Sequence, residues 1–205
     1  IIDTDPGIDD TIAIFLALRS PEIEVVGLTS VFGNTDIENA TLNSLRLVET
    51  AGFPNIPVAK GSGCPIVMPM PGLGTFVHGM DGMGNTNPPP PKGKPIDISA
   101  AQFIVDTVMQ NPGEITLVPV GPLTNIGLAL RLEPKIADNV KEVVIMGGAA
   151  HGKGNSSPVA EANIIHDPHA ASIVFSADWQ VTMVGLDVTT QVVMSPAYLK
   201  EISGN

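Results

Sequence analysis

The chain alternates short runs of apolar residues with longer stretches in which apolar residues recur every three or four positions. The short runs are typical of strands buried on both faces of a parallel sheet. The longer stretches have the period of amphipathic helices and are long enough to connect parallel strands. The predicted strands are 1–2, 24–31, 115–120, 142–146 and 180–184, and the predicted helices are 9–18, 37–50, 99–109, 122–132 and 167–177.

This alternation predicts an α/β fold: an open, mostly parallel, Rossmann-like sheet with helices on both faces. The 205 residues are enough for one domain, and the sequence has no internal repeat. Residues 61–95 break the rhythm, because they contain many glycines and a run of prolines at 88–91. A long stretch of this kind inside a compact domain is often a functional loop, so we expect a lid over a ligand pocket.

Composition and charge narrow the classes of function. Hydrophobic residues make up 43% of the chain and charged residues 15%, which is typical of a globular protein. The formal net charge of −11 would repel nucleic acids and anionic membranes, so we expect neither as a partner. Cys64 is the only cysteine, which excludes an intrachain disulfide. We therefore expect a cytoplasmic protein, and we find no signal peptide or membrane-spanning run.

Four carboxylates fall within eight residues between the first predicted strand and the first helix, in the run Asp3-Thr4-Asp5-Pro6-Gly7-Ile8-Asp9-Asp10. Ligands of open α/β sheets bind at the carboxyl ends of strands. Carboxylates crowded there repel one another unless a cation lies among them. Because the run offers only oxygen ligands, Ca²⁺ or Mg²⁺ fits it better than Zn²⁺. Helix capping would explain one or two of the aspartates, but not all four.

Two other classes of protein carry closely spaced acidic residues: EF-hand proteins and phosphotransferases that form an aspartyl-phosphate. An EF-hand loop starting at Asp3 would need Gly at its sixth place and Glu at its twelfth, which are Ile8 and Ile14 here. The EF-hand is therefore excluded. Phosphotransferases that form an aspartyl-phosphate also begin with paired aspartates after a first strand. No convincing downstream lysine partner is found, but a Mg²⁺-dependent phosphohydrolase stays open as an alternative.

The run Asp-x-Asp-Pro-Gly-x-Asp-Asp resembles the signature of the inosine–uridine-preferring nucleoside hydrolases. Further motifs of that family follow in the same order, so that the resemblance extends from Asp3 to about Ala171. They are Gly33-Asn34, His78-Gly79, the segment Gly121-Pro122-Leu123-Thr124-Asn125, and Asn155 together with Glu161-Ala162-Asn163 and Asp167-Pro168.

The resemblance implies an enzyme of nucleoside salvage that uses Ca²⁺ to hydrolyse the N-glycosidic bond of purine or pyrimidine ribonucleosides. The family is usually dimeric or tetrameric, which implies a homodimer or homotetramer here. Its metal ligands correspond to Asp5, Asp10 and the main-chain carbonyl of Val120. Asp5 would also be the catalytic residue that takes a proton from the attacking water. Asp3 would orient these neighbours without touching the substrate.

The resemblance also implies a set of substrate-binding residues, whose amide and carboxylate groups suit the hydroxyls of ribose. Taken singly, several of them are equally well explained as turn, loop or solvent-exposed residues, and those interpretations stay open. His166 is expected at the surface or at a helix cap. The implied substrate-binding residues are Asp9, Asn34, His78, Asn155, Glu161 and Asn163.

The sequence departs from the family in one respect. Nucleoside hydrolases carry a later His-Asp-Pro-type motif, whose Asp completes the Ca²⁺ shell and whose His is linked to protonation of the leaving base. No such motif follows Thr190. We therefore expect residues 1–205 to form a nucleoside hydrolase domain without its C-terminal part. A nucleoside- or ribose-binding domain without catalytic activity stays open as an alternative.

Overall fold

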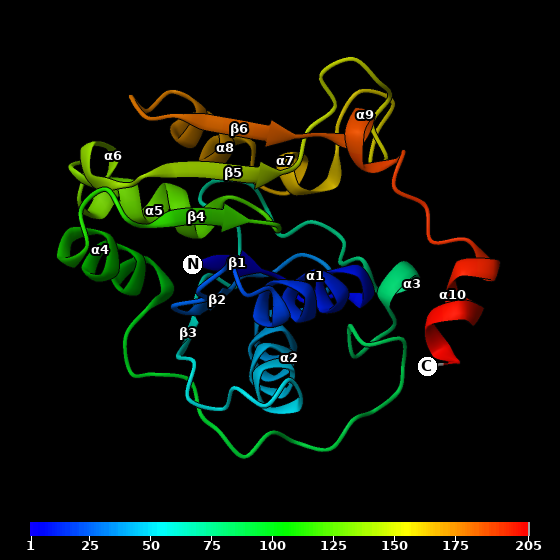
Figure 1. Ribbon diagram of the computed structural model, residues 1–205. Coiled ribbons are helices and arrows are strands. Elements are labelled where there is room, and N and C mark those ends of the chain that lie inside the picture. The colour runs from blue at the N-terminus through cyan, green and yellow to red at the C-terminus, as the bar shows by residue number, and fades with distance from the viewer. Residues whose placement is uncertain (205) are drawn as a thin grey trace.

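The computed structural model describes residues 1–204 and is built on a six-stranded sheet, all of whose strand pairs are parallel. The spatial order is β3-β2-β1-β4-β5-β6, so the chain winds outward from β1 first in one direction and then in the other (Figure 1). This arrangement confirms the predicted fold class. The strands are Ile2–Thr4 (β1), Leu28–Ser30 (β2), Val58–Lys60 (β3), Thr116–Pro119 (β4), Glu142–Met146 (β5) and Val181–Val184 (β6).

Helices cover both faces of the sheet. One face carries α1 (Ile8–Arg19) and α2 (Ile37–Thr50), and the other carries α4 (Ala100–Gln110), α5 (Thr124–Leu132), α6 (Ile136–Asn139) and α8 (Pro168–Phe175). The other helices of residues 1–204 are α3 (Thr75–His78), α7 (Ala162–His166), α9 (Leu186–Thr189) and α10 (Pro196–Ser203), and Ile164 of α7 packs against the α4–α5–α8 side. Within residues 1–204, no helix is both long enough and apolar enough to cross a bilayer.

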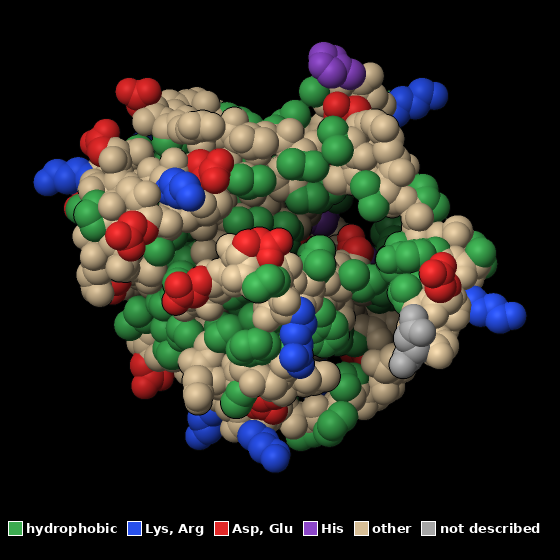
Figure 2. Space-filling view, viewed as in Figure 1, with side chains coloured by type: hydrophobic (Ala, Val, Ile, Leu, Met, Phe, Trp, Pro, Cys, Tyr) green, Lys and Arg blue, Asp and Glu red, His purple; other side chains and the backbone are tan. Residues whose placement is uncertain are grey.

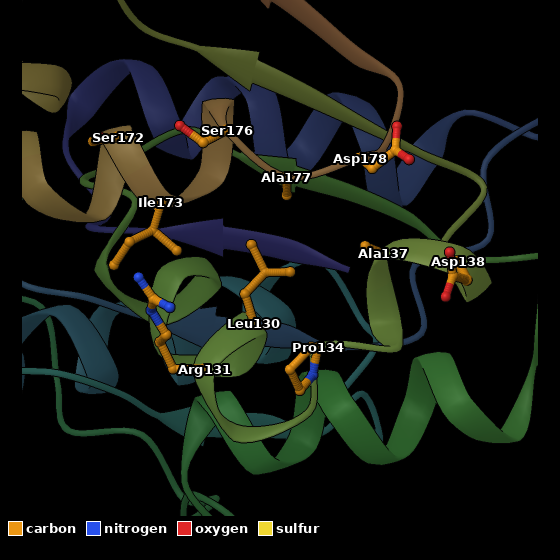
Figure 3. A pocket seen from close by; sticks show the side chains of 10 residues that line it. All are labelled: Leu130, Arg131, Pro134, Ala137, Asp138, Ser172, Ile173, Ser176, Ala177 and Asp178. Atoms are coloured by element: carbon orange, nitrogen blue, oxygen red, sulfur yellow. The ribbon is translucent and has the colours of Figure 1, made fainter.

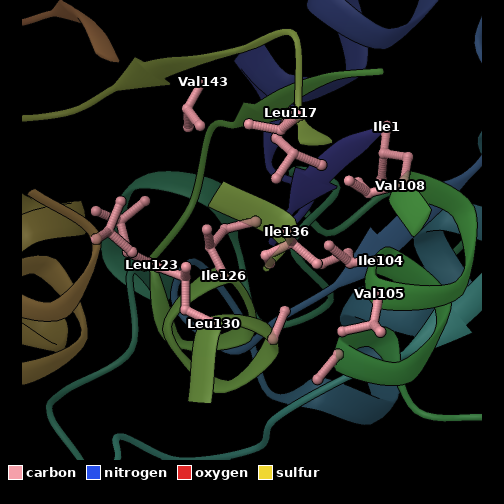
Figure 4. Close-up of a cluster of buried hydrophobic side chains, with 14 of the residues drawn as sticks. Ile1, Ile104, Val105, Val108, Leu117, Leu123, Ile126, Leu130, Ile136 and Val143 are labelled. Carbon is pink, nitrogen blue, oxygen red and sulfur yellow. The ribbon is translucent and has the colours of Figure 1, made fainter. Parts of the chain in front are cut away.

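Two apolar clusters hold these layers together. Ile1, directly before β1, and Ile2, the first residue of β1, contribute to different clusters. Ile1 packs with the α4–α5–α8 layer, whereas Ile2 packs with α1 and α2, because successive side chains of a strand point to opposite faces. The larger cluster includes Ile104 of α4, Leu117 of β4 and Ile126 of α5, none of which is exposed (Figure 4). Burial of each such side chain contributes about 1.5–3 kcal/mol.

Some predicted boundaries were wrong, for local reasons. The strand predicted over 24–31 is only β2, since residues 21–24 are exposed and the neighbouring strands β1 and β3 pair with three residues alone. The strand β3 and the short helix α6 were not predicted. The helix predicted from Asp167 begins one residue later, because Asp167 precedes a proline and caps α8 by accepting a hydrogen bond from the Ala170 amide.

Candidate active site

The candidate site lies at the carboxyl edge of the sheet, where β1 and β4 are neighbours. The connections from these two strands run to opposite sides, and such a switch point leaves a crevice in open α/β sheets. Asp5 follows β1 directly, and Val120 and Gly121 follow β4. The strand arrowheads in Figure 1 point toward this edge, and Figure 2 shows the molecule hollowed there, with acidic side chains in view.

Asp5, Asp10 and Asn34 form the centre of the site. Both aspartates are buried, with 1% and 6% of their surface exposed. The main-chain N–H of Asn34 donates to Asp5 Oδ2 at 2.7 Å, and its side-chain Nδ2 donates to Asp10 Oδ2 at 3.0 Å. Asn34 therefore links the two carboxylates. Asp10 also accepts hydrogen bonds from Thr4 Oγ1 at 3.1 Å and from the Gly7 amide at 2.9 Å.

The electrostatics of this centre are unfavourable for two negative charges. Burial raises the pKa of Asp5 well above its usual value, and the charge of Asp10 raises it further. Burial, and then the charge of Asp9, raise the pKa of Asp10 to about 6. Asp5 Oδ1 is buried and has no hydrogen-bond partner among the described residues. A buried carboxylate oxygen without a donor calls for a proton or a cation.

Two glycines allow the backbone to approach the Asp5 carboxylate. A Cβ atom at Gly33 would lie 2.0 Å from Asp5 Oδ2, and one at Gly121 would lie 2.7 Å from Asp5 Oδ1. Both distances are shorter than any tolerable contact. Any larger residue at either position would displace the carboxylate, which explains why Gly follows both the second and the fourth strand at this edge.

The groups around Asp5 fit a hard cation in their chemistry. They are the carboxylates of Asp5 and Asp10 and the carbonyl of Val120, which accepts one hydrogen bond from Asn163 Nδ2 at 2.9 Å and keeps a second lone pair. All are oxygen ligands, as Ca²⁺ and Mg²⁺ prefer. Over residues 1–204, no three or more His, Cys, Asp or Glu side chains converge as a metal group. The candidate set thus depends on two carboxylates and one main-chain oxygen.

Asp3 lies fully buried beside this centre and does not face solvent. Its Oδ1 accepts hydrogen bonds from Thr29 Oγ1 at 2.5 Å and from Asn125 Nδ2 at 2.7 Å. Burial raises the pKa of Asp3 to about 6, although these two hydrogen bonds oppose the shift. This placement suits a residue that orients its neighbours.

Asp9 and His78 lie at the outer rim of the site. The Asp9 side chain is 84% exposed, and its Oδ1 is 3.8 Å from His78 Nδ1. The Ile8 amide donates to His78 Nδ1 at 3.2 Å, so a neutral His78 carries its proton on Nε2. Asn43 Nδ2 donates to the Asp81 carbonyl at 2.9 Å. The bond from Ile8 thus places His78, in the segment predicted as a lid, directly against the acidic turn of residues 3–10, and the bond from Asn43 joins the same segment to α2.

The remaining predicted substrate residues lie around α7. Glu161 is 2% exposed and caps this helix, since its carboxylate accepts hydrogen bonds from the Asn163, Ile164 and Gly148 amides. Asn163 Nδ2 donates to the Val120 carbonyl, which connects α7 to the end of β4. Asn155 lies apart on an exposed loop, where its Oδ1 accepts from the Ala162 amide at 2.9 Å.

Two residues of this region were not predicted as parts of the site. Asn125 bonds Asp3 directly, a contact that only the folded chain reveals because 122 positions separate the two residues. His166 was predicted at the surface or at a cap, but its ring lies 6.4 Å from that of Phe32 and burial lowers its pKa. Its Nδ1 is buried, with no hydrogen-bond partner in the described part of the chain.

A groove of about 550 Å³ lies away from this site, at the C-terminal ends of α5 and α8 (Figure 3). Helices end at the amino edge of a parallel sheet, so the groove is at the opposite edge from Asp5. Its lining combines apolar side chains such as Ile173 with the charged groups of Arg131, Asp138 and Asp178. It contains none of the residues predicted for the site.

Comparison with known proteins extends over the whole chain. A family model described as inosine-uridine preferring nucleoside hydrolase matches residues 1–205. Uridine nucleosidase 1 of Arabidopsis thaliana is 48% identical over 202 residues, and the inosine-uridine preferring nucleoside hydrolase of Leishmania major is 50% identical over 204 residues. A solved plant nucleoside hydrolase superposes with a TM-score of 0.96 at 44% identity.

The matches cover 98% of this chain in all three cases. The chain spans 60% of the Arabidopsis protein, 64% of the Leishmania protein and 64% of the solved plant chain. It thus corresponds to less than two thirds of each of these relatives.

Proposed function

We propose, from the premise that this chain belongs to the inosine-uridine preferring nucleoside hydrolase family, that it forms the catalytic core of a nucleoside N-ribohydrolase. Family membership confirms the resemblance found in the sequence. The observation that carries the proposal is the buried Oδ1 of Asp5, which has no hydrogen-bond partner within residues 1–204 and lies at the switch point of the sheet beside a second buried carboxylate. The names of the relatives favour uridine and inosine as substrates.

Asp5, Asp10 and the Val120 carbonyl would hold the metal of the proposed enzyme. Ca²⁺ is the cation that the family resemblance implies, and oxygen-only ligands are compatible with it. When bound, Ca²⁺ would supply positive charge that offsets the two carboxylates and makes a nearby water more acidic. The residues themselves favour this role, because their charges repel each other at a place where water cannot screen them.

Asp5 is the proposed general base. Its Oδ1 accepts no hydrogen bond from any residue within 1–204, so a lone pair of the carboxylate is free to take a proton from a nearby water. Water would attack C1′ of the ribose while the C1′–N bond to the base breaks, its electron pair leaving with the base. One proton of that water passes to Asp5. The departing base takes up a proton from solvent, and Asp5 returns its own proton to solvent. The products are ribose and the free base.

The side chains proposed to hold the ribose are Asp9, Asn34, His78, Asn155, Glu161 and Asn163. The transition state of such a reaction has oxocarbenium-ion character, so positive charge develops on the sugar. The neighbouring carboxylates stabilise that charge more than they stabilise the neutral nucleoside, which is what catalysis requires. The Asp9 side chain is 84% exposed and therefore accessible to a substrate that enters from solvent, whereas the His78 side chain beside it is 13% exposed.

The family resemblance also favours a homodimer or homotetramer that acts on small-molecule nucleosides. A single exposed cysteine and the acidic composition favour a reducing, cytoplasmic location and argue against nucleic-acid partners. These parts of the proposal concern the whole protein, of which the site described above is the centre.

The test is release of reducing sugar from uridine and inosine, first with Ca²⁺, then after chelation, and then after Ca²⁺ is restored. Turnover that disappears on chelation and returns with Ca²⁺ is the expected result. A protein that binds the nucleoside or ribose in the presence of Ca²⁺ but releases no reducing sugar from uridine or inosine would instead be a binding domain. Hydrolysis of nitrophenyl phosphate with a trapped aspartyl-phosphate would identify a phosphohydrolase and reject the proposal.

A further inference from the structure

Asn125 makes an unusual set of hydrogen bonds beneath the candidate site. Its side chain is 1% exposed, and Nδ2 donates to Asp3 Oδ1 at 2.7 Å and to the Ser30 carbonyl at 2.9 Å. Its Oδ1 accepts from the Ser62 amide at 2.9 Å. Both protons of the amide nitrogen are therefore used, and one carboxamide contacts three separate segments of the chain.

These segments are the ends of three neighbouring strands. Asp3 belongs to β1, Ser30 is the last residue of β2, and Ser62 follows β3 by two residues. Asn125 itself is the second residue of α5, the helix that follows β4. A single side chain thus connects the carboxyl ends of β3, β2 and β1 to the helix after β4. These four strands are consecutive in the sheet.

The backbone at Gly61 packs closely against this carboxamide. A Cβ atom at Gly61 would lie 2.3 Å from both Nδ2 and Oδ1 of Asn125, and equally close to the Ser30 carbonyl. Gly61 therefore allows the chain after β3 to lie directly on the carboxamide. The Phe32 amide in turn donates to the Ser62 carbonyl at 3.1 Å, which joins this turn to the segment leading to Asn34.

Each connected segment carries a group of the site. Asp3 lies in β1, two residues before Asp5, which follows the strand directly. Ser30 and Phe32 lead to Asn34, whose amide donates to Asp5. Val120 lies five residues before Asn125, at the end of β4. The relative placement of Asp5, Asn34 and the Val120 carbonyl thus depends on groups that Asn125 ties together.

We propose that Asn125 is a positioning residue, which sets the geometry of the Asp5, Asp10 and Val120 oxygens through Asp3 and the three strand ends. This inference rests on the proposed function, and it adds a residue that does not itself contact metal or substrate. Partners of this kind, which orient metal ligands from behind, commonly contribute about 10–100-fold to metal affinity or activity.

The experiment compares Asn125→Ala with Asn111→Ala in the full chain. Asn111 is a matched control, because its Nδ2 also donates to a main-chain carbonyl, that of Thr107 at 2.8 Å, but at the C-terminal end of α4. Calorimetry would measure Ca²⁺ affinity, kinetics would measure kcat and KM for uridine, and thermal unfolding would measure stability. Asn125→Ser is the second variant, since its hydroxyl can still donate one hydrogen bond.

We expect Asn125→Ala to weaken Ca²⁺ binding by at least about tenfold and to lower kcat more than it raises KM. Asn125→Ser should recover part of the loss, and Asn111→Ala should retain wild-type affinity and kcat. Folded Asn125→Ala or Asn125→Ser protein with wild-type Ca²⁺ affinity and kcat would overturn the positioning role while leaving the proposed function intact. A wild-type protein that neither binds Ca²⁺ nor releases ribose would reject both proposals.

Discussion

Two regions of this molecule are equally buried but differ in chemistry. Between the sheet and the layer of α4, α5 and α8, buried side chains such as Ile104 and Leu117 are entirely apolar and exclude water. At the carboxyl edge, Asp3 and Asp5 are just as inaccessible, at 0% and 1% exposure, and each has one oxygen with no hydrogen-bond partner in the part of the chain that the structure describes. The apolar region stabilises the fold, whereas the acidic edge is arranged at the expense of stability.

The pH dependence of the two regions differs for the same reason. Apolar burial does not involve a proton, so its contribution persists across the pH range. Burial raises the pKa of Asp3 and Asp10 from 3.8 to about 6, which means that the folded chain binds these protons more tightly than the unfolded chain. Their contribution to stability is present below pH 3.8 and is lost as the pH rises through 6. Residues retained at such a cost are characteristic of functional sites.

The largest effect should come from Asp5→Asn at the acidic edge. The change keeps the size of the side chain but removes a metal ligand and the proposed proton acceptor. We expect kcat for nucleoside hydrolysis to fall by at least about 10²–10⁴-fold, while the fold persists because one of the crowded charges is gone. Asp3→Asn is the control, and it should cost less because Asp3 lies behind the site. Near-normal turnover of Asp5→Asn would contradict the assigned mechanism.

The reverse outcome is expected for Ile104→Ala in the apolar region. Ile104 is fully buried in α4, and truncation leaves a cavity, so the free energy of unfolding should fall by about 2–5 kcal/mol. The kcat at a temperature well below the unfolding midpoint should not change, because the helix α4 contributes no predicted site residue. Denaturant unfolding and steady-state kinetics measure the two effects. A parallel loss of kcat in fully folded protein would show that the regions are not independent.

Calcium should stabilise the acidic edge and so reduce the difference in stability between the two regions. If the cation binds the folded chain alone, free Ca²⁺ at about 100 times its Kd adds about 2.7 kcal/mol to stability. The thermal midpoint of the wild type should therefore rise with Ca²⁺ concentration, and Asp5→Asn should lose most of this response. A midpoint that is unaffected by Ca²⁺ in the wild type would count against a cation at this edge.

The length of each element and its distant contacts decided how much of the fold could be predicted from the sequence. The helix α2 and the strand β5 were predicted to the residue, because each is long enough to display its hydrophobic period. β3 was not predicted, because its three residues are too few to display the alternation of apolar and polar side chains along a strand. The break between α7 and α8 occurs at Asp167, which caps α8. Its carboxylate also accepts hydrogen bonds from Thr124 Oγ1 and from the Ile66 amide, which are distant in the sequence.

The candidate site was predictable only where its residues are close in the sequence. Asp5 and Asp10 belong to one short run, so their crowding was visible before folding. The bond from Asn125 to Asp3 spans 122 positions, and that from Asn34 to Asp5 spans 29. Sheet order decides which of these distant residues meet. The motif around Asn125 was recognised through the family resemblance, but its partner in β1 was not.

The smallest effect should come from Arg131→Ala, in the groove at the opposite edge from Asp5. Arg131 is exposed, and the groove that it lines shares no residue with the predicted site. Substitutions on exposed surface usually change stability by within about 0.5 kcal/mol, so the unfolding midpoint should barely move. Since the groove and the acidic turn are separated by the apolar layer, kcat and KM for uridine should stay within about twofold of wild type, which is well below the tenfold that 1.4 kcal/mol represents. A larger change in KM at unchanged stability would mean that this edge communicates with the site, and the two regions compared here could no longer be treated as separate.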